Sequence, residues 1–140
     1  MKKKLSVALI AIVVITTVLG ATALAASAQS IVDTANAQIE QEIGRAIAQA
    51  NQATAVYDAS VQALQGCGGP QAAALLALCN ALYDARLDQI ASTLVMKTDM
   101  IARKAIADAA ALGVTVVCQY EPVTLGDRVV LVDPLVVVSD

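Results

Sequence analysis

Hydrophobic residues recur in steps of three and four over residues 30–65, a stretch that contains no proline. This spacing places them on one side of a helix and leaves polar side chains such as Gln41, Arg45 and Gln49 facing water. Gly44 marks either a weak point of this helix or a close approach by a partner helix. The recurring residues are Val32, Ala35, Ile39, Ile43, Ala46, Ile47, Ala50, Tyr57, Val61 and Leu64.

A second helical pattern begins at Pro70, a residue favoured in the first turn of a helix, and runs to Leu112 before Gly113. Between the two patterns, residues 66–70 hold three glycines and a proline, which cannot continue a helix. The spacing therefore predicts two helices, each about 50–65 Å long, that fold back antiparallel at this bend. The second apolar stripe comprises Leu75, Leu76, Cys79, Leu82, Tyr83, Leu87, Ile90, Leu94, Ile101, Ala105 and Leu112.

After Gly113 the pattern changes to a period of two, which is typical of a half-buried strand. Val114, Val116, Cys118 and Tyr120 then share one face of residues 114–121. A turn signal follows at residues 124–127, although Pro122 is expected to end strand pairing early.

A second strand is predicted over residues 128–132, and Asp133 and Pro134 interrupt it before residues 135–138. The predicted fold is α+β and mainly α: a long antiparallel helical hairpin followed by a short C-terminal β-hairpin with a kinked tail. The predicted divisions are a signal segment at 1–28, the helical hairpin at 29–113 and the strands with their tail at 114–140.

The last apolar residues lie on both faces of the predicted strands, and one helical hairpin covers only one face of a sheet. A strand whose second face is uncovered is either an aggregation hazard or a site for a partner. We therefore interpret six residues as an assembly surface: Val130, Val132, Leu135, Val136, Val137 and Val138. The competing interpretation, of equal weight, is that this tail packs on its own helices.

The beginning of the chain has the three-part layout of a secretory signal peptide. Lys2, Lys3 and Lys4 precede an uncharged apolar stretch at residues 5–19, and small residues then offer cleavage after Ala25 or Ala28. The alternative is an uncleaved anchor, because residues 5–26 would reach roughly 33 Å as a helix and could cross a bilayer. Both interpretations place the rest of the chain outside the cytoplasm.

Composition and charge exclude several classes of function. Three of the nine Lys and Arg residues precede the apolar stretch, which leaves six against twelve acidic residues and argues against nucleic acid as a partner. Histidine is absent from the sequence, so the commonest general base and the commonest metal ligand are missing. The 58% of hydrophobic residues include no Phe or Trp, which favours thin helices that approach closely.

Three cysteines in an exported chain allow one disulfide and one remaining thiol. We predict a bond between Cys67 in the bend and Cys79 two turns into the second helix, with Cys118 as a buried free thiol or an intermolecular bridge. Separated cysteines without histidine do not match a zinc site. The scattered acids Asp127 and Asp133, together with Asp140, are expected to be a solvated surface rather than a calcium site.

No serine, cysteine or carboxylate stands at the spacing of a known catalytic motif, so neither an enzyme nor a cofactor is expected. The sequence favours an exported structural or interaction protein of the cell envelope or the medium. Its partner would be a second copy or another envelope protein, bound through helix faces or the C-terminal strands. The alternative is a membrane-anchored extracytoplasmic adaptor or stalk, and a small-molecule binder between hairpin and sheet is a weaker third option.

Overall fold

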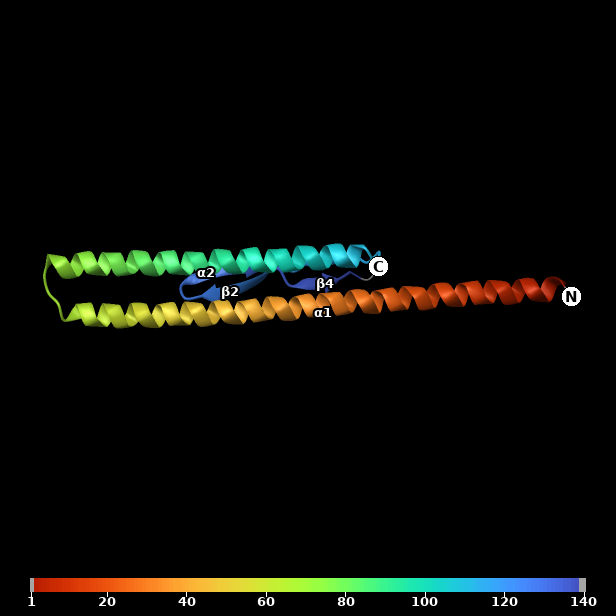
Figure 1. Ribbon diagram of the computed structural model, residues 1–140, viewed down its shortest axis with the longest axis horizontal. Coiled ribbons are helices and arrows are strands. Elements are labelled where there is room, and N and C mark those ends of the chain that lie inside the picture. The colour runs from red at the N-terminus through yellow and green to blue at the C-terminus, as the bar shows by residue number, and fades with distance from the viewer. Residues whose placement is uncertain (1, 139–140) are drawn as a thin grey trace.

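Two long helices lie side by side and form an antiparallel hairpin (Figure 1). The structure is a computed structural model that describes the backbone of residues 2–138 and the side chains of residues 23–138. Helix α1 spans Lys2–Gln65 and helix α2 spans Pro70–Ala110. The predicted fold class, a mainly helical hairpin with short C-terminal antiparallel strands, is confirmed.

Helix α1 extends well past the end of α2 at its N-terminal side (Figure 1). Most of the predicted signal segment, residues 1–28, lies outside the residues whose side chains are described. Between residues 23 and 138, neither helix carries a segment long and apolar enough to cross a membrane.

The bend between the helices lies where the glycines predicted it. Cys67 N donates to Leu64 O at 2.9 Å and closes the last turn of α1. Gly69 then precedes α2 with φ of 104°, a backbone angle that side-chain-bearing residues rarely adopt, and Pro70 begins the helix. A methyl group added to Gly44 would have no atom within 4 Å, so Gly44 is an open helical position and not a close approach to α2.

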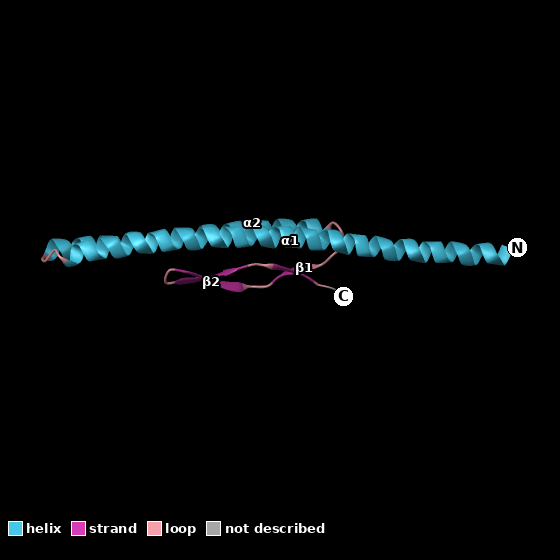
Figure 2. Cartoon of the chain, turned by 90° about the horizontal axis from the view of Figure 1, so that it is seen from below, coloured by secondary structure: helices cyan, strands magenta, loops and turns pink. Residues whose placement is uncertain are grey.

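The C-terminal segment forms one long, interrupted β-hairpin, which we call the ribbon. Strands β2 (Glu121–Leu125) and β3 (Arg128–Val132) pair around the turn, and β1 (Val116–Cys118) and β4 (Leu135–Val137) pair beyond them. The residues predicted as a kinked tail are therefore a paired strand. Figure 2 shows the ribbon as a layer along one side of the helix pair.

Pro122 does not end the pairing, contrary to the expectation from the sequence, because it lies opposite Leu131 within β2 and β3. Leu125 and Arg128 flank the two-residue turn, so hydrogen-bonded and non-hydrogen-bonded pairs alternate outward from them. Three residues further along, Pro122 occupies a non-hydrogen-bonded position. Its nitrogen faces away from β3, so the missing N–H costs no bond of the ladder.

The core consists of two clusters, and each combines both helices with one end of the ribbon. The helices contribute mainly alanines to one cluster, whereas in the other α2 also contributes Leu87, Ile90 and Leu94. The ribbon supplies valine and leucine to both clusters and fills the space between the helices. One cluster comprises Ala28, Val32, Ala35, Ala102, Ala105, Ala109, Val116 and Leu135. The other comprises Ala46, Ala50, Leu87, Ile90, Leu94, Val123, Leu125 and Val132.

Polar contacts fix the position of the ribbon along the helices. Asn36 Nδ2 donates to Leu135 O at 2.9 Å, and Leu135 N donates to Asn36 Oδ1 at 2.8 Å, so one side chain of α1 pairs with the backbone of β4. At the other end, Arg128 Nη2 lies 3.1 Å from Asp84 Oδ1 and Arg128 Nε lies 3.0 Å from Asp88 Oδ1. Both aspartates are exposed, so this ion pair orients β3 more than it stabilises it.

The ribbon turn approaches α2 very closely. Gly126 occupies the first central position of the turn with φ of 63°, which matches a type II′ hairpin turn. A methyl group added to Gly126 would lie 2.8 Å from the Tyr83 hydroxyl and 3.0 Å from Leu87 Cδ1. Both the backbone angle and the space at this position therefore require glycine.

Replacing Gly126 tests this turn. We expect Gly126→Ala to lower the free energy of unfolding by about 2–3 kcal/mol, because alanine is strained at positive φ and collides with Tyr83. Gly44→Ala is the matched control and should raise it by roughly 0.5–1 kcal/mol, since that site is helical and open. Urea titration followed by circular dichroism at one protein concentration measures both. Equal midpoints for Gly126→Ala and wild type would contradict the close turn.

Candidate functional site

The two faces of the ribbon differ in what covers them. Val116, Val123, Leu125, Val132 and Leu135 point toward the helices and are buried. The alternate residues point away and are exposed: Val117, Val129, Leu131, Val136 and Val138. Val129 and Leu131 are 66% and 56% exposed. The strands therefore carry one apolar face that packs on the helices and a second that nothing in the described chain covers.

The six residues predicted as an assembly surface are divided between these faces. Val132 and Leu135 are 0% and 2% exposed and belong to the core, and Val130 and Val137 are half-buried against it. Val136 and Val138 lie on the uncovered face. The set predicted from the sequence missed Val117, Val129 and Leu131, because the pairing register that separates the faces was not known.

The strand register aligns the outward residues in cross-strand pairs. Val117 lies opposite Val136, Pro122 lies opposite Leu131, and Thr124 lies opposite Val129. None of these residues carries a charge. We call the surface formed by these three pairs and Val138 the outer face of the ribbon.

A second apolar surface lies on the bend end of the hairpin, which projects past the ribbon turn (Figure 1). Residues 59–83 contain no charged side chain. Four leucines of α2 in this segment are exposed: Leu75, Leu76, Leu78 and Leu82. We call this segment the tip.

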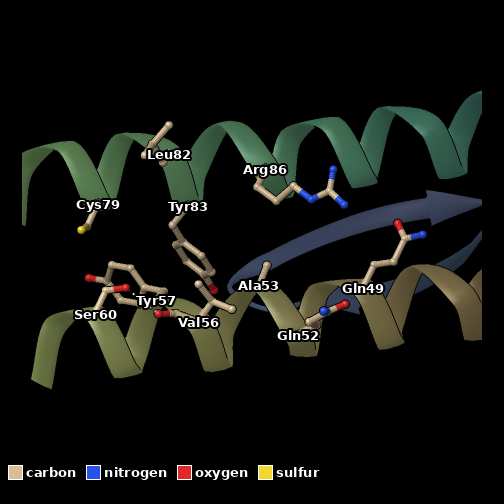
Figure 3. Close-up of a pocket in the computed structure, with 10 residues that line it drawn as sticks. All are labelled: Gln49, Gln52, Ala53, Val56, Tyr57, Ser60, Cys79, Leu82, Tyr83 and Arg86. Carbon is tan, nitrogen blue, oxygen red and sulfur yellow. Dashed lines mark hydrogen bonds between the residues drawn. The ribbon is translucent and has the colours of Figure 1, made fainter. Parts of the chain in front are cut away.

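A cavity of about 370 Å³ lies between the helices next to the tip (Figure 3). The rings of Tyr57 and Tyr83 stack in it with centroids 4.6 Å apart. Tyr57 OH donates to Asn80 Oδ1 at 2.8 Å, and Tyr83 OH lies 3.1 Å from Thr54 Oγ1, which itself donates to Ala50 O. Both phenol groups therefore have partners within the protein, and the stack joins the two helices where the ribbon ends.

All three cysteines are free thiols in this structure. Cys67 is exposed in the bend, and its Sγ lies 3.8 Å from Ala63 O of α1. Cys79 lines the cavity beside the tyrosines, roughly 14 Å along α2 from its first residue. The disulfide between Cys67 and Cys79 stays a prediction.

Cys118 lies on the inward side of β1 and is half-buried. Burial raises the pKa of its thiol, and the negative charges of Asp133 and Asp99 raise it further. The thiolate is the reactive form of cysteine, so this environment makes Cys118 a poor nucleophile at neutral pH.

An ion pair joins the two helices midway along the hairpin. Lys97 Nζ lies 2.8 Å from Glu42 Oε2, and Arg45 Nη1 lies 2.6 Å from Glu42 Oε1. The hydrogen bond from Lys97 lowers the pKa of the Glu42 carboxyl below its usual range. The contact therefore persists at neutral pH and is lost as the pH falls through the lowered pKa.

The described part of the chain contains no group of acidic residues and cysteines that could hold a metal ion. Asp127 and Asp133 belong to this part, whereas Asp140 lies outside the described residues. No protein-family model, curated protein or solved structure matches the chain. The surfaces described above are therefore the features of this chain that bear on its function.

Alkylation rates should distinguish the three thiols. In the reduced, folded protein we expect iodoacetamide to modify exposed Cys67 fastest and Cys118 slowest at pH 8, because the raised pKa and burial of Cys118 leave little accessible thiolate. Peptide mass spectrometry measures the rates, and the difference should disappear in denaturant. Labelling of Cys67 and Cys79 only after reduction would show that the predicted disulfide forms. Rapid labelling of Cys118 in the folded protein would contradict its position.

Proposed function

We propose that this chain is an exported, non-enzymatic structural or interaction protein of the cell envelope or the extracellular medium, and that it associates with itself. The observation that carries the proposal is the one-sided packing of the fold. The helices cover one face of the ribbon, the ribbon covers one side of the helices, and each layer leaves apolar side chains on its other side.

The amount of exposed apolar surface supports association. Among residues 23–138, sixteen large hydrophobic side chains are exposed, which is nearly as many as the seventeen hydrophobic residues of the core. Single exposed hydrophobic residues are normal on soluble proteins, but contiguous patches mark interaction sites. The outward residues of the ribbon lie in cross-strand pairs and the exposed leucines of the tip follow one helix, so both sets are grouped, and a partner for at least one of them would complete the packing.

The export part of the proposal rests on the sequence of residues 1–28. A positive start, an uncharged apolar stretch and small residues at two cleavage positions direct a chain across a membrane.

Measuring the molar mass in solution tests self-association. We expect analytical ultracentrifugation of the exported, processed protein to give a dimer or larger species that dissociates on dilution. The species should persist in 0.5 M salt, because apolar contacts are not screened whereas exposed ion pairs are. A monomer at every concentration would contradict the proposal.

A membrane-anchored stalk is the second candidate function. It is favoured by the continuity of α1, which runs as one helix from Lys2 to Gln65 with no break between the apolar segment and the hairpin. An uncleaved segment would then hold the hairpin upright on the outer side of the membrane.

The N-terminus of the exported protein separates the two candidates. If the segment is cleaved, as the sequence favours, N-terminal sequencing should begin at Ala26 or Gln29 and the protein should leave the membrane fraction. An intact start at Met1 or Lys2 in the membrane fraction would instead support the stalk. Extraction with carbonate provides the control, since it releases peripheral proteins and retains anchored ones.

A further inference from the structure

We infer that the outer face of the ribbon binds the outer face of a second copy, so that two ribbons stack between two pairs of helices. This inference rests on the proposed self-association and names the surface responsible for it. The sequence left helix faces and strands as alternatives. The arrangement of the outward residues favours the strands.

The outer face of the ribbon is accessible to a second ribbon. The ribbon lies on one side of the helix pair, and no other part of the described chain lies beyond it (Figure 2). A second ribbon can therefore approach along the whole length of the outer face without meeting a helix. Stacked sheets pack about 10 Å apart through interdigitated side chains, and exposed Val129 and Leu131 are large enough to fill such a layer.

The outer face of the ribbon is uncharged. The outward cross-strand pairs carry no charged residue, whereas the chain as a whole has a net charge of −3. A charged partner would find no complementary group on this face. Two copies of an acidic chain, in contrast, meet with little repulsion if their uncharged faces are the ones in contact. Contact between the same face of two copies also produces a closed dimer with two-fold symmetry.

The outer face of the ribbon has the area that a dimer interface needs. A specific interface buries at least about 1,000 Å² in total, which is about 500 Å² from each copy. The five outward hydrophobic residues are 40% to 66% exposed, and together with exposed Pro122 and Thr124 they would supply roughly that area if two copies stacked. The face therefore suffices for a concentration-dependent dimer. Pro122 directs the pairing to this face and away from the edge of β2, because its outward nitrogen cannot donate to an added strand.

The tip is the strongest competing surface, since it is also uncharged. Its exposed residues Leu75, Leu78 and Leu82 follow one face of a single helix at one end of the molecule. The outer face of the ribbon draws residues from four strands and follows the side of the helix pair, whereas the tip leucines come from one helix at one end, so the ribbon offers the longer contact between two copies.

Two matched double variants decide between these surfaces. Val129→Glu with Leu131→Glu places two charges on the outer face of the ribbon, and Leu78→Glu with Leu82→Glu places two on the tip. All four residues are exposed in the monomer, between 54% and 66%, so the substitutions leave the core unchanged. Circular dichroism verifies folding, and sedimentation equilibrium measures the dissociation constant of each variant against wild type.

We expect the ribbon variant to weaken association about 100-fold or more, because each dimer would then bury four like charges, while the tip variant stays close to wild type. If wild type associates and the ribbon variant associates equally well, the inference is overturned but self-association stands. Loss of association in the tip variant alone would assign the interface to the tip. A wild type that is monomeric at all concentrations overturns both proposals.

A milder variant covers the case in which the charged ribbon fails to fold. Val129→Thr with Leu131→Thr keeps strand-favouring, uncharged side chains and should weaken association about 10-fold. An unchanged dissociation constant for this folded variant would again overturn the inference.

Flotation of wild type with phosphatidylcholine–phosphatidylglycerol vesicles tests whether lipid occupies the outer face instead. If the vesicles bind wild type but not the ribbon variant, and no dimer forms in solution, the face binds lipid and the inference of a second copy is overturned.

Discussion

The structure depends on the packing of the ribbon into the seam between two alanine-rich helices. Alanine lets helices approach closely and favours helix formation, but it buries little apolar area. Val116, Val123, Leu125, Val132 and Leu135 supply the volume that the alanines lack. A two-stranded ribbon is itself marginal in water, so neither layer accounts for the fold without the other. The hairpin and the ribbon therefore form one cooperative unit.

This dependence makes the register of the ribbon critical. A shift of one residue would turn the inward side chains outward and expose the core. Asn36 opposes such a shift because its amide bonds both the N–H and the C=O of Leu135, and Gly126 opposes it because only glycine fits beneath Tyr83. The same register creates the outer face, since every residue that packs inward leaves its neighbours pointing away. The buried core and the candidate interface therefore both result from the alternation of inward and outward side chains along the strands.

The helices, the bend and the turn were predictable because their signals are local: a period of three to four, residues 66–70, and Gly126 beside Asp127. The pairing of β4 with β1 could not be predicted from local signals, because it joins residues that β2 and β3 separate in the sequence. The prediction for Pro122 was wrong because its effect depends on whether its nitrogen faces the partner strand, which the pairing register decides. The candidate surface was found only in part: Val136 and Val138 lie on it, but the more exposed Val129 and Leu131 could be separated from buried Val132 only with the register known.

The geometry of a ribbon-to-ribbon dimer connects to the fate of the N-terminal segment. Two stacked faces are related by an axis within the plane between them, and this axis runs either along the helices or across them. If residues 1–28 remain as an anchor, both copies start from one membrane, so only the axis along the helices is allowed and both tips point away from the surface together. If the segment is removed, the two-fold axis can take either direction, and its direction depends on how Val129, Leu131 and Val136 of the two copies interdigitate. The anchored form would thus present two uncharged tips side by side, which doubles the apolar surface available there to a further partner.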